Sequence, residues 1–254
     1  VKVDGDGGYA SLAIETGIPP LAEAAHETGI AVLVITNNHH FAALWHETEA
    51  LAEQGLCALA CVNYAAVVAP HGGTQALFGT NPISFAWPRP DGAPVVFDMA
   101  TSAMARGDIQ IAARDGQPVP TGVGLDSHGE PSTDPAEILN GVQLPFGGHK
   151  GSALALMVEL LAAGMTGEPF GPEAADDVSD GGPPRGSEFI IAMAPELFAG
   201  ESWDKRPEDF LQRFEAMDGA RLPGERRHRM RADTGPRAVN TELLGIIESL
   251  RHST

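Results

Sequence analysis

The stretch "IPPLAEAAHETGIAVLVI", residues 18–35, predicts how the chain begins to fold. Its apolar residues recur at helical spacing as far as Thr28, and the glycine at position 29 is typical of a helix end. Residues 30–35 then form a continuous apolar run of strand length. The stretch therefore predicts a helix over 18–28, a glycine stop and a buried strand.

The same pattern returns further along the chain. A helix is predicted over 41–54, where Gly55 ends it, and a buried strand over 56–62. Two such units in a row indicate an α/β fold, a mixed α+β sheet with flanking helices. Residues 152–165 predict a buried helix because they are apolar on most sides. Further strands are expected at 84–87, 95–97 and 189–193.

Two segments interrupt this pattern. Residues 171–188, "GPEAADDVSDGGPPRGSE", predict a Pro/Gly/acid-rich surface loop without core-forming residues. After Glu201 the character becomes helical, with Phe210, Phe214 and Met217 on one face. We therefore expect an α/β domain over residues 1–200 and a C-terminal helical segment over 201–254.

Composition excludes several classes of protein. With 254 residues, 43% of them hydrophobic and 20% charged, the chain reads as globular. A net charge of −18 argues against nucleic acid, and no apolar stretch is long enough for a membrane span. The absence of a secretory signal and the two cysteines, Cys57 and Cys61, favour a cytoplasmic location.

The basic residues cluster late in the chain. Five arginines fall between positions 221 and 231, whereas the whole chain holds three lysines. Such a cluster on an acidic protein indicates either a site for a small anionic ligand or a solvated basic surface.

The stretch "NNHHFAALW", residues 37–45, holds two adjacent histidines. A zinc site formed with Cys57 and Cys61 is disfavoured, because the spacing matches no common finger or ribbon, and we expect no metal. A turn between Ile35 and Phe41 would instead direct backbone N–H groups and a helix dipole toward an anion, with His40 as a further donor.

Three other motifs each allow two interpretations. In "FGTNP", residues 78–82, Thr80 and Asn81 are either donors for a carboxylate or simply turn residues. Asp98 ends an apolar strand and is either a site residue or part of the turn before a helix cap. "FGGHKG", residues 146–151, is neither a P-loop nor a dinucleotide fingerprint, but it can cradle an anion or start a helix with an exposed Lys150. Asp108 in "ARGD" either pairs with Arg106 or orients a catalytic histidine.

Taken in order, "NNHHFAALW", "LFGTNPISFAWPR", "VVFDMATSAMARGDIQIAARDG", "LPFGGHKGSALALMVELLAAGMTG" and "RLPGERR" resemble a known family. The chain is similar to the malate/L-lactate dehydrogenase-like oxidoreductases, which bind NAD(P)H on a non-Rossmann fold. The paired histidines and the "FGGHKGSAL" and "GDIQIAAR" stretches resemble its branch of Δ1-piperideine-2-carboxylate/Δ1-pyrroline-2-carboxylate reductases.

The resemblance implies a role for individual residues. Asp108 would be the acidic member of a Ser-His-Asp relay, and Thr80 would contact the substrate carboxylate. Arginine guanidinium groups suit phosphate, which gives the late cluster a purpose. The cofactor-binding residues would be His40, Phe41, Ala42, Ala43, Leu44, Asp98, Met99, Ala100, Arg106, Gly107, His149, Lys150, Arg221, Leu222, Pro223, Gly224, Glu225, Arg226 and Arg227.

The implied function is NADPH-dependent reduction of a small-molecule cyclic imine carboxylate by a homodimer, with NADH as a second possible cofactor. In the family an N-terminal helical part precedes the segment that begins here at Val1, and it carries the serine and histidine of the relay. We expect that part to be absent from this chain. Two alternatives stay open: a malate/L-lactate-type 2-hydroxy acid dehydrogenase, and a nucleotide-binding module without turnover.

Overall fold

The computed structural model describes residues 1–39, 43–176 and 185–251, and their centre is a six-stranded mixed sheet. The strand order is β1-β2-β9-β3-β4-β5; β1 pairs with β2 in parallel, and every other pair is antiparallel. The strands are β1 (Lys2–Asp4), β2 (Ile30–His39), β3 (Cys57–Val62), β4 (Ile83–Trp87), β5 (Val95–Met99) and β9 (Arg185–Met193).

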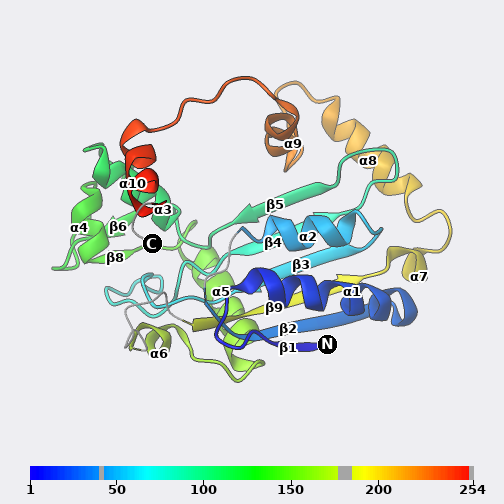
Figure 1. Cartoon of the computed structure of the whole chain (residues 1–254), viewed down its shortest axis with the longest axis horizontal. Helices are drawn as coiled ribbons and strands as arrows, with labels where there is room; N and C mark the ends of the chain where they lie inside the picture. Colours follow the sequence, from blue (N-terminus) through cyan, green and yellow to red (C-terminus); the bar gives the residue numbers. More distant parts are fainter. Residues whose placement is uncertain (40–42, 177–184, 252–254) are drawn as a thin grey trace.

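Helices cover both faces of this sheet (Figure 1). On one face α1 (Ala10–Thr28) and α2 (Trp45–Ala52) bury their apolar sides against residues such as Leu33 and Ile190. On the other face α5 (His149–Val158) and a π-helical continuation, η1 (Glu159–Gly164), pack against Phe189. Successive residues of one strand point to opposite faces, so Phe189 and Ile190 separate the two cores.

A smaller lobe lies beside the sheet. It contains a three-stranded sheet of order β7-β6-β8, with α3 and α4 packed over it around Ile109 and Ile138. Its elements are α3 (Arg106–Arg114), β6 (Gly124–Leu125), β7 (Pro131–Ser132), α4 (Pro135–Asn140) and β8 (Val142–Gln143). The remaining helices are α6 (Gly171–Asp176), α7 (Pro195–Ala199), α8 (Lys205–Glu215), α9 (Glu225–Ala232) and α10 (Thr241–Arg251). Among the described residues, no helix is both long and apolar enough to cross a bilayer.

The predicted fold class is confirmed, and the first helix differs in its start. The α1 helix begins at Ala10 rather than Ile18 and continues through Pro19 and Pro20, which lie on its exposed side. Its buried residues include Ile14 and Ile18, so packing on the sheet outweighs the backbone hydrogen bonds that proline removes. The helix ends as predicted at Gly29, whose φ of 89° suits glycine.

The expectation of a surface loop over 171–188 was wrong at both ends. Residues 171–176 form α6, and β9 begins at Arg185. Gly186, Ser187 and Glu188 are buried in the sheet, although the sequence there contains no large apolar side chain. Residues 177–184 lie outside the described part of the chain.

The predicted helical character after residue 200 is confirmed by α8, α9 and α10. The α8 helix is tied to the β4–β5 connection by Arg89, whose guanidinium contacts Glu208 at 2.6 Å and Glu215 at 2.9 Å. On the expected apolar face of this segment, Phe210 and Met217 are exposed. The boundary near residue 200 stays a prediction.

Candidate cofactor site

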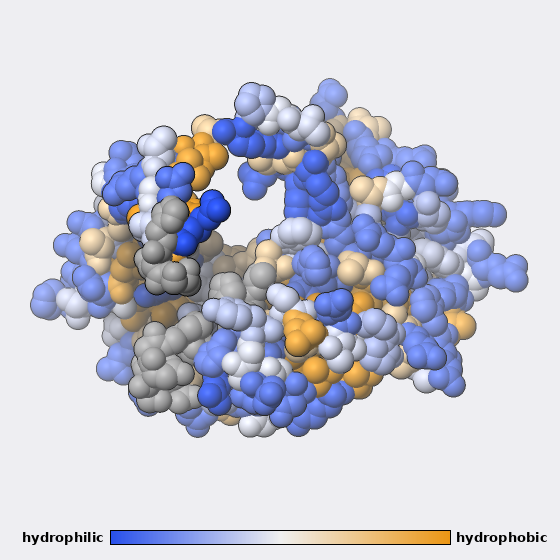
Figure 2. Space-filling view, viewed as in Figure 1, coloured by the Kyte–Doolittle hydropathy of each residue, from blue (hydrophilic) through white to orange (hydrophobic). Residues whose placement is uncertain are grey.

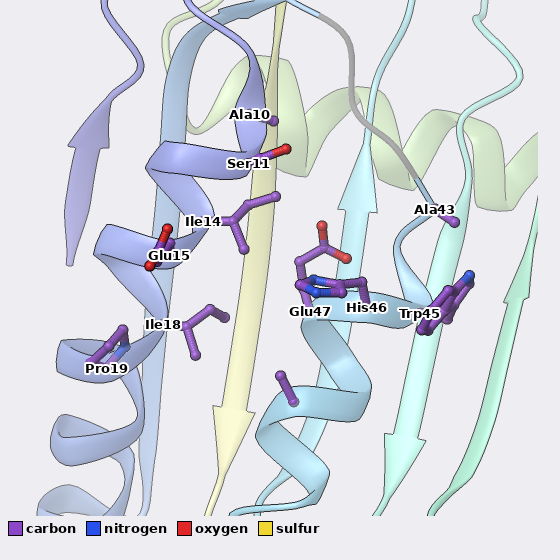
Figure 3. A pocket seen from close by; sticks show the side chains of 11 residues that line it. Ala10, Ser11, Ile14, Glu15, Ile18, Pro19, Ala43, Trp45, His46 and Glu47 are labelled. Atoms are coloured by element: carbon purple, nitrogen blue, oxygen red, sulfur yellow. The ribbon is translucent and has the colours of Figure 1, made fainter. Parts of the chain in front are cut away.

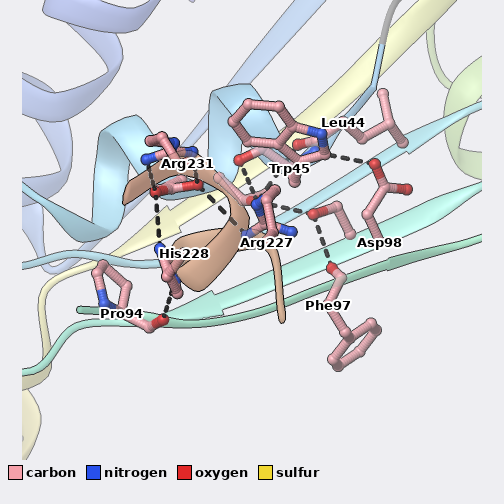
Figure 4. A network of polar contacts seen from close by, with 11 residues as sticks. Leu44, Trp45, Pro94, Phe97, Asp98, Arg227, His228 and Arg231 are labelled. Carbon is pink, nitrogen blue, oxygen red and sulfur yellow. Dashed lines mark hydrogen bonds and ion pairs between the residues drawn. The ribbon is translucent and has the colours of Figure 1, made fainter. Parts of the chain in front are cut away.

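The end of β5 contacts the first residue of α2. Oδ2 of Asp98 accepts a hydrogen bond of 3.1 Å from the backbone N–H of Trp45 (Figure 4). Burial raises the pKa of Asp98, and the Trp45 N–H and the Arg227 charge only partly offset that effect. Asp98 therefore fixes where α2 starts, and with it the position of the buried Leu44.

The turn expected between Ile35 and Phe41 begins later than predicted. Residues 36–39 belong to β2, which bulges between Ile35 and Asn38 and pairs with β9 as far as His39. The Trp45 N–H, one of the amides at the start of α2, already donates to Asp98. His40, Phe41 and Ala42 lie outside the described residues, so their predicted cofactor contacts stay predictions.

Part of the late arginine cluster binds a carboxylate of α2. Oε1 of the buried Glu49 lies 2.7 Å from Arg231 and 3.6 Å from the ring of His228, and Oε2 lies 3.3 Å from Arg227 (Figure 4). Arg227 and Arg231 also lie over the ring of Trp45, at 4.6 and 5.2 Å from its centroid. Burial raises the pKa of Glu49, but these cations outweigh burial and lower it. The α9 helix is thereby attached to α2.

The loop before α9 lies against β5. The backbone N–H of Val96 donates to the carbonyl oxygen of Pro223 at 3.2 Å, and Leu222 is buried. Gly224 has a φ of 90°, and a Cβ at that position would lie 2.9 Å from the carbonyl oxygen of Val96. Only glycine permits this close approach without strain.

This loop also encloses a small basic pocket. The pocket has a volume of about 360 Å³ and is lined by Gly219, Arg221, Leu222, Gly224 and Arg226. Arg221, Glu225 and Arg226 are exposed, whereas Nε of Arg227 is buried and has no hydrogen-bond partner among the described residues. Guanidinium groups at a pocket rim fit a phosphate ligand.

Backbone hydrogen bonds connect the end of β5 to two other predicted site segments. The N–H and hydroxyl of Thr101 donate to the carbonyl oxygen of Thr80, at 2.9 and 3.0 Å. The carbonyl oxygen of Thr101 accepts from the N–H of Phe146 at 3.0 Å, and Phe146 leads into the glycines that precede α5. Thr80, Met99 and Ala100 are thus held near the segment that carries His149 and Lys150.

His149 and Lys150 are exposed at the start of α5. The ring of His149 makes an edge contact with His71, with 6.1 Å between centroids. Gly148, the residue before α5, has a positive φ of 61°, which suits a glycine turn before a helix.

Arg106, Gly107 and Asp108 form the first turn of α3. The Arg106 guanidinium donates to Gln143 at 3.4 Å, and burial lowers its pKa. Asp108 is exposed, and its backbone N–H donates to the carbonyl oxygen of Ala105. Of the two interpretations of Asp108, neither an ion pair nor a relay contact is established by these positions.

These segments surround one hollow of the molecule. In Figure 1, α9 lies above α2 and β5, and α10 lies beside α3 on the other side of the opening. Figure 2 shows the surface hollowed between α9 and α10, with hydrophilic residues on both sides of the opening. Val96 of β5 contacts the arginine loop, and Thr101, just after β5, contacts Phe146 before α5, so this stretch of chain connects the two segments.

Sequence reasoning missed a group of buried polar side chains beneath α2. Glu47, Glu188 and Asn38 are all buried, and atoms of each lack hydrogen-bond partners among the described residues. Burial raises the pKa of Glu47 to about 7, and burial together with the charges of Glu47 and Asp98 raises the pKa of Glu188. The available signal was the strand period: Glu188 shares its face with Ile190 and Ala192.

Comparisons with known proteins agree with this architecture. A family model described as malate/L-lactate dehydrogenase matches residues 1–241. A Δ1-pyrroline-2-carboxylate/Δ1-piperideine-2-carboxylate reductase of Pseudomonas putida is 48% identical over 255 residues, covering 98% of this chain and 75% of that protein. The chain belongs to the malate/L-lactate dehydrogenase family.

Two solved structures are also similar. The crystal structure of a Δ1-piperideine-2-carboxylate reductase from Pseudomonas syringae pvar. tomato has a TM-score of 0.90 and 44% identity, covering 98% of this chain and 76% of that one. A putative malate/lactate dehydrogenase from E. coli has a TM-score of 0.86 and 31% identity, with coverage of 98% and 73%. The chain thus spans about three quarters of the length of these relatives.

Proposed function

We propose that this protein reduces cyclic imine carboxylates, namely Δ1-piperideine-2-carboxylate and Δ1-pyrroline-2-carboxylate, with NADPH as the preferred electron donor. The observation that carries the proposal is the near-complete match to reductases named for these two substrates, at 48% identity in the P. putida protein. As a member of a dehydrogenase family, the chain uses a nicotinamide cofactor.

The described residues fit such a cofactor. The basic pocket of Arg221 and Arg226 suits a phosphate group. Asp98, Met99 and Ala100 would continue the site toward His149 and Lys150. NADPH carries one phosphate more than NADH, and the exposed arginines of the loop are the groups that would recognise it.

The substrate would lie beside the nicotinamide. A bound nicotinamide cofactor supplies the hydride that reduces the imine carbon. In this assignment the Thr80 hydroxyl donates to the substrate carboxylate, and Asp108 orients the group that protonates the ring nitrogen. The carbonyl of Thr80 is held by Thr101, which leaves its side chain as the group available to a ligand.

The proposal extends to the assembly: we expect two copies of the chain to form a homodimer in solution and the protein to act in the cytoplasm. Sedimentation velocity measures the first of these directly. A monomer at all protein concentrations would contradict the dimer without affecting the assignment of the reaction.

The activity is tested by following oxidation of NADPH and NADH with each imine, and with pyruvate and oxaloacetate as controls. We expect turnover with the imines and a preference for NADPH. Turnover with the oxo acids alone would support the 2-hydroxy acid dehydrogenase alternative. NADPH binding in calorimetry without any turnover would support the non-catalytic alternative.

A further inference from the structure

The α1 and α2 helices enclose a second pocket, of about 670 Å³ (Figure 3). Its walls are mostly apolar and include Ile14, Ile18 and Pro19 of α1 and Ala50 of α2. This volume is typical of sites for small organic molecules. The lining thus provides an apolar cavity, and its few polar groups decide what it can bind.

The polar side chains of the lining include Ser11, Glu15, His46 and Glu47, and of these four Glu47 alone is buried. Figure 3 shows the Glu47 side chain between the two helices, on the side of α2 that faces Ile14 and Ile18. Glu47 is only 2% exposed, and its Oε2 has no hydrogen-bond partner among the described residues. An unpaired buried carboxylate is costly, so the position calls for a proton or a cation.

A neighbour on the same helix shows what Glu47 lacks. Glu49 also has little exposed surface, but it contacts Arg227, His228 and Arg231. Residues two apart on a helix face opposite directions, so these cations do not serve Glu47. The charges that act on Glu47 come from Asp98, which is itself acidic.

Two further polar groups lie beneath Glu47 on the same face of the sheet. Glu188 pairs in register with Ile35 and Asn38 pairs with Gly186, so both side chains face α1 and α2. Both carboxylate oxygens of Glu188 and both amide atoms of Asn38 lack partners among the described residues. Glu188 thus places a second carboxyl group without a hydrogen-bond partner behind the pocket, and Asn38 places an amide without one there.

We propose that this pocket binds a small organic cation, with an ammonium group at Glu47 and a compact apolar body against Ile14 and Ile18. An ammonium group supplies several N–H donors, and a hydrocarbon ring suits the apolar walls. The described side chains form no group of three metal-ligating residues, which favours an organic cation over a metal ion.

The pocket adjoins the proposed cofactor site, because Ala43 and Trp45 line it, but the proposal does not rest on the proposed function. The arginine cluster contacts α2 through Glu49, on the side opposite to Glu47. Asn81, next to Thr80, donates to Glu159 of η1 at 2.9 Å, on the other face of the sheet. The pocket therefore lies across the sheet from the helices that neighbour Thr80.

The test uses cyclohexylamine as the cationic probe and cyclohexanol as a neutral probe of similar size, with binding followed by calorimetry. We expect saturable binding of cyclohexylamine, and an affinity for cyclohexanol that is weaker by about tenfold or more, since a charge-assisted contact is lost. Equal affinity for both probes, or no saturable binding of cyclohexylamine, would overturn the proposal.

Three variants locate the binding. Glu47→Gln removes the charge and should weaken cyclohexylamine by about tenfold or more, whereas Glu15→Gln, at the exposed rim of the same pocket, should leave the affinity within about twofold. If Glu47→Gln does not fold, Ser11→Trp at the exposed mouth should block binding without touching the core. Unchanged cyclohexylamine binding in a folded Glu47→Gln variant, or in the Ser11→Trp variant, refutes the assignment.

A dimer that forms and excludes cyclohexylamine would also overturn the proposal, because a second copy of the chain would then be the ligand of this pocket.

Discussion

Substituting Glu47 by glutamine tests whether folding shifts the pKa of this buried carboxyl group. Burial raises the pKa of Glu47 from 4.5 to about 7, and the charge of Asp98 adds to the effect. The folded protein therefore holds this proton more tightly than the unfolded chain does. The contribution of Glu47 to stability is therefore complete below pH 4.5, where the group is protonated in both states, and is lost as the pH rises to 7.

The size of the effect follows from the two pKa values. One pKa unit corresponds to about 1.4 kcal/mol, so the wild type should lose about 3 kcal/mol of unfolding free energy from this group across that range. Glutamine has the same shape and does not ionise, so the Glu47→Gln variant lacks this loss. The difference in unfolding free energy, variant minus wild type, should therefore be about 3 kcal/mol larger at pH 8 than at pH 4.5.

Urea unfolding followed by circular dichroism at several pH values measures these free energies. Glu15→Gln is the matched control, because Glu15 is exposed on the same pocket, and its curve should run parallel to that of the wild type. A parallel curve for Glu47→Gln as well would refute the reasoning, because it would mean that Glu47 titrates alike in the folded and unfolded chains.

Three other predictions concern the arginine loop and α9. Glu49→Gln should destabilise the protein by about 1–3 kcal/mol in urea unfolding, because it leaves Arg231 and its neighbours without their buried carboxylate; an unchanged free energy would contradict the role given to this cluster. Gly224→Ala should cost about 1–3 kcal/mol by the same measurement, because of its φ of 90° and the close Val96 carbonyl, and a stabilised variant would be inconsistent with that strain. Arg226→Ala should weaken NADPH about tenfold more than NADH in fluorescence titrations, and equal losses would exclude this arginine as the group that recognises the additional phosphate.

Most of the fold could be predicted from the local spacing of apolar residues. The apolar run 30–35 and the glycine at position 29 correctly predicted a helix followed by a strand, because hydrophobic spacing reflects which side faces the core. It failed where tertiary packing outweighed local preference. The spacing predicted a helix start at Ile18, yet the chain upstream is helical from Ala10 because Ile14 packs on the sheet.

The candidate site was less accessible to sequence reasoning. Sequence order alone does not show that Asp98 meets the amide of Trp45, or that Glu49 receives Arg231 from a helix far along the chain. Both contacts depend on sheet order and helix docking. Glu188 was hidden for a different reason: its surroundings are rich in glycine, proline and acids, which is typical of a loop, and only strand register reveals that it is buried.

The central claim is that the end of β5, the start of α5 and the arginine loop bind one dinucleotide. Titrating the isotopically labelled chain with NADPH, and following backbone amide resonances, tests this claim most directly. We predict that the amides of Asp98, Lys150 and Arg226 shift together and saturate with a single dissociation constant. Shifts confined to one of these segments, or separate dissociation constants for them, would contradict the account.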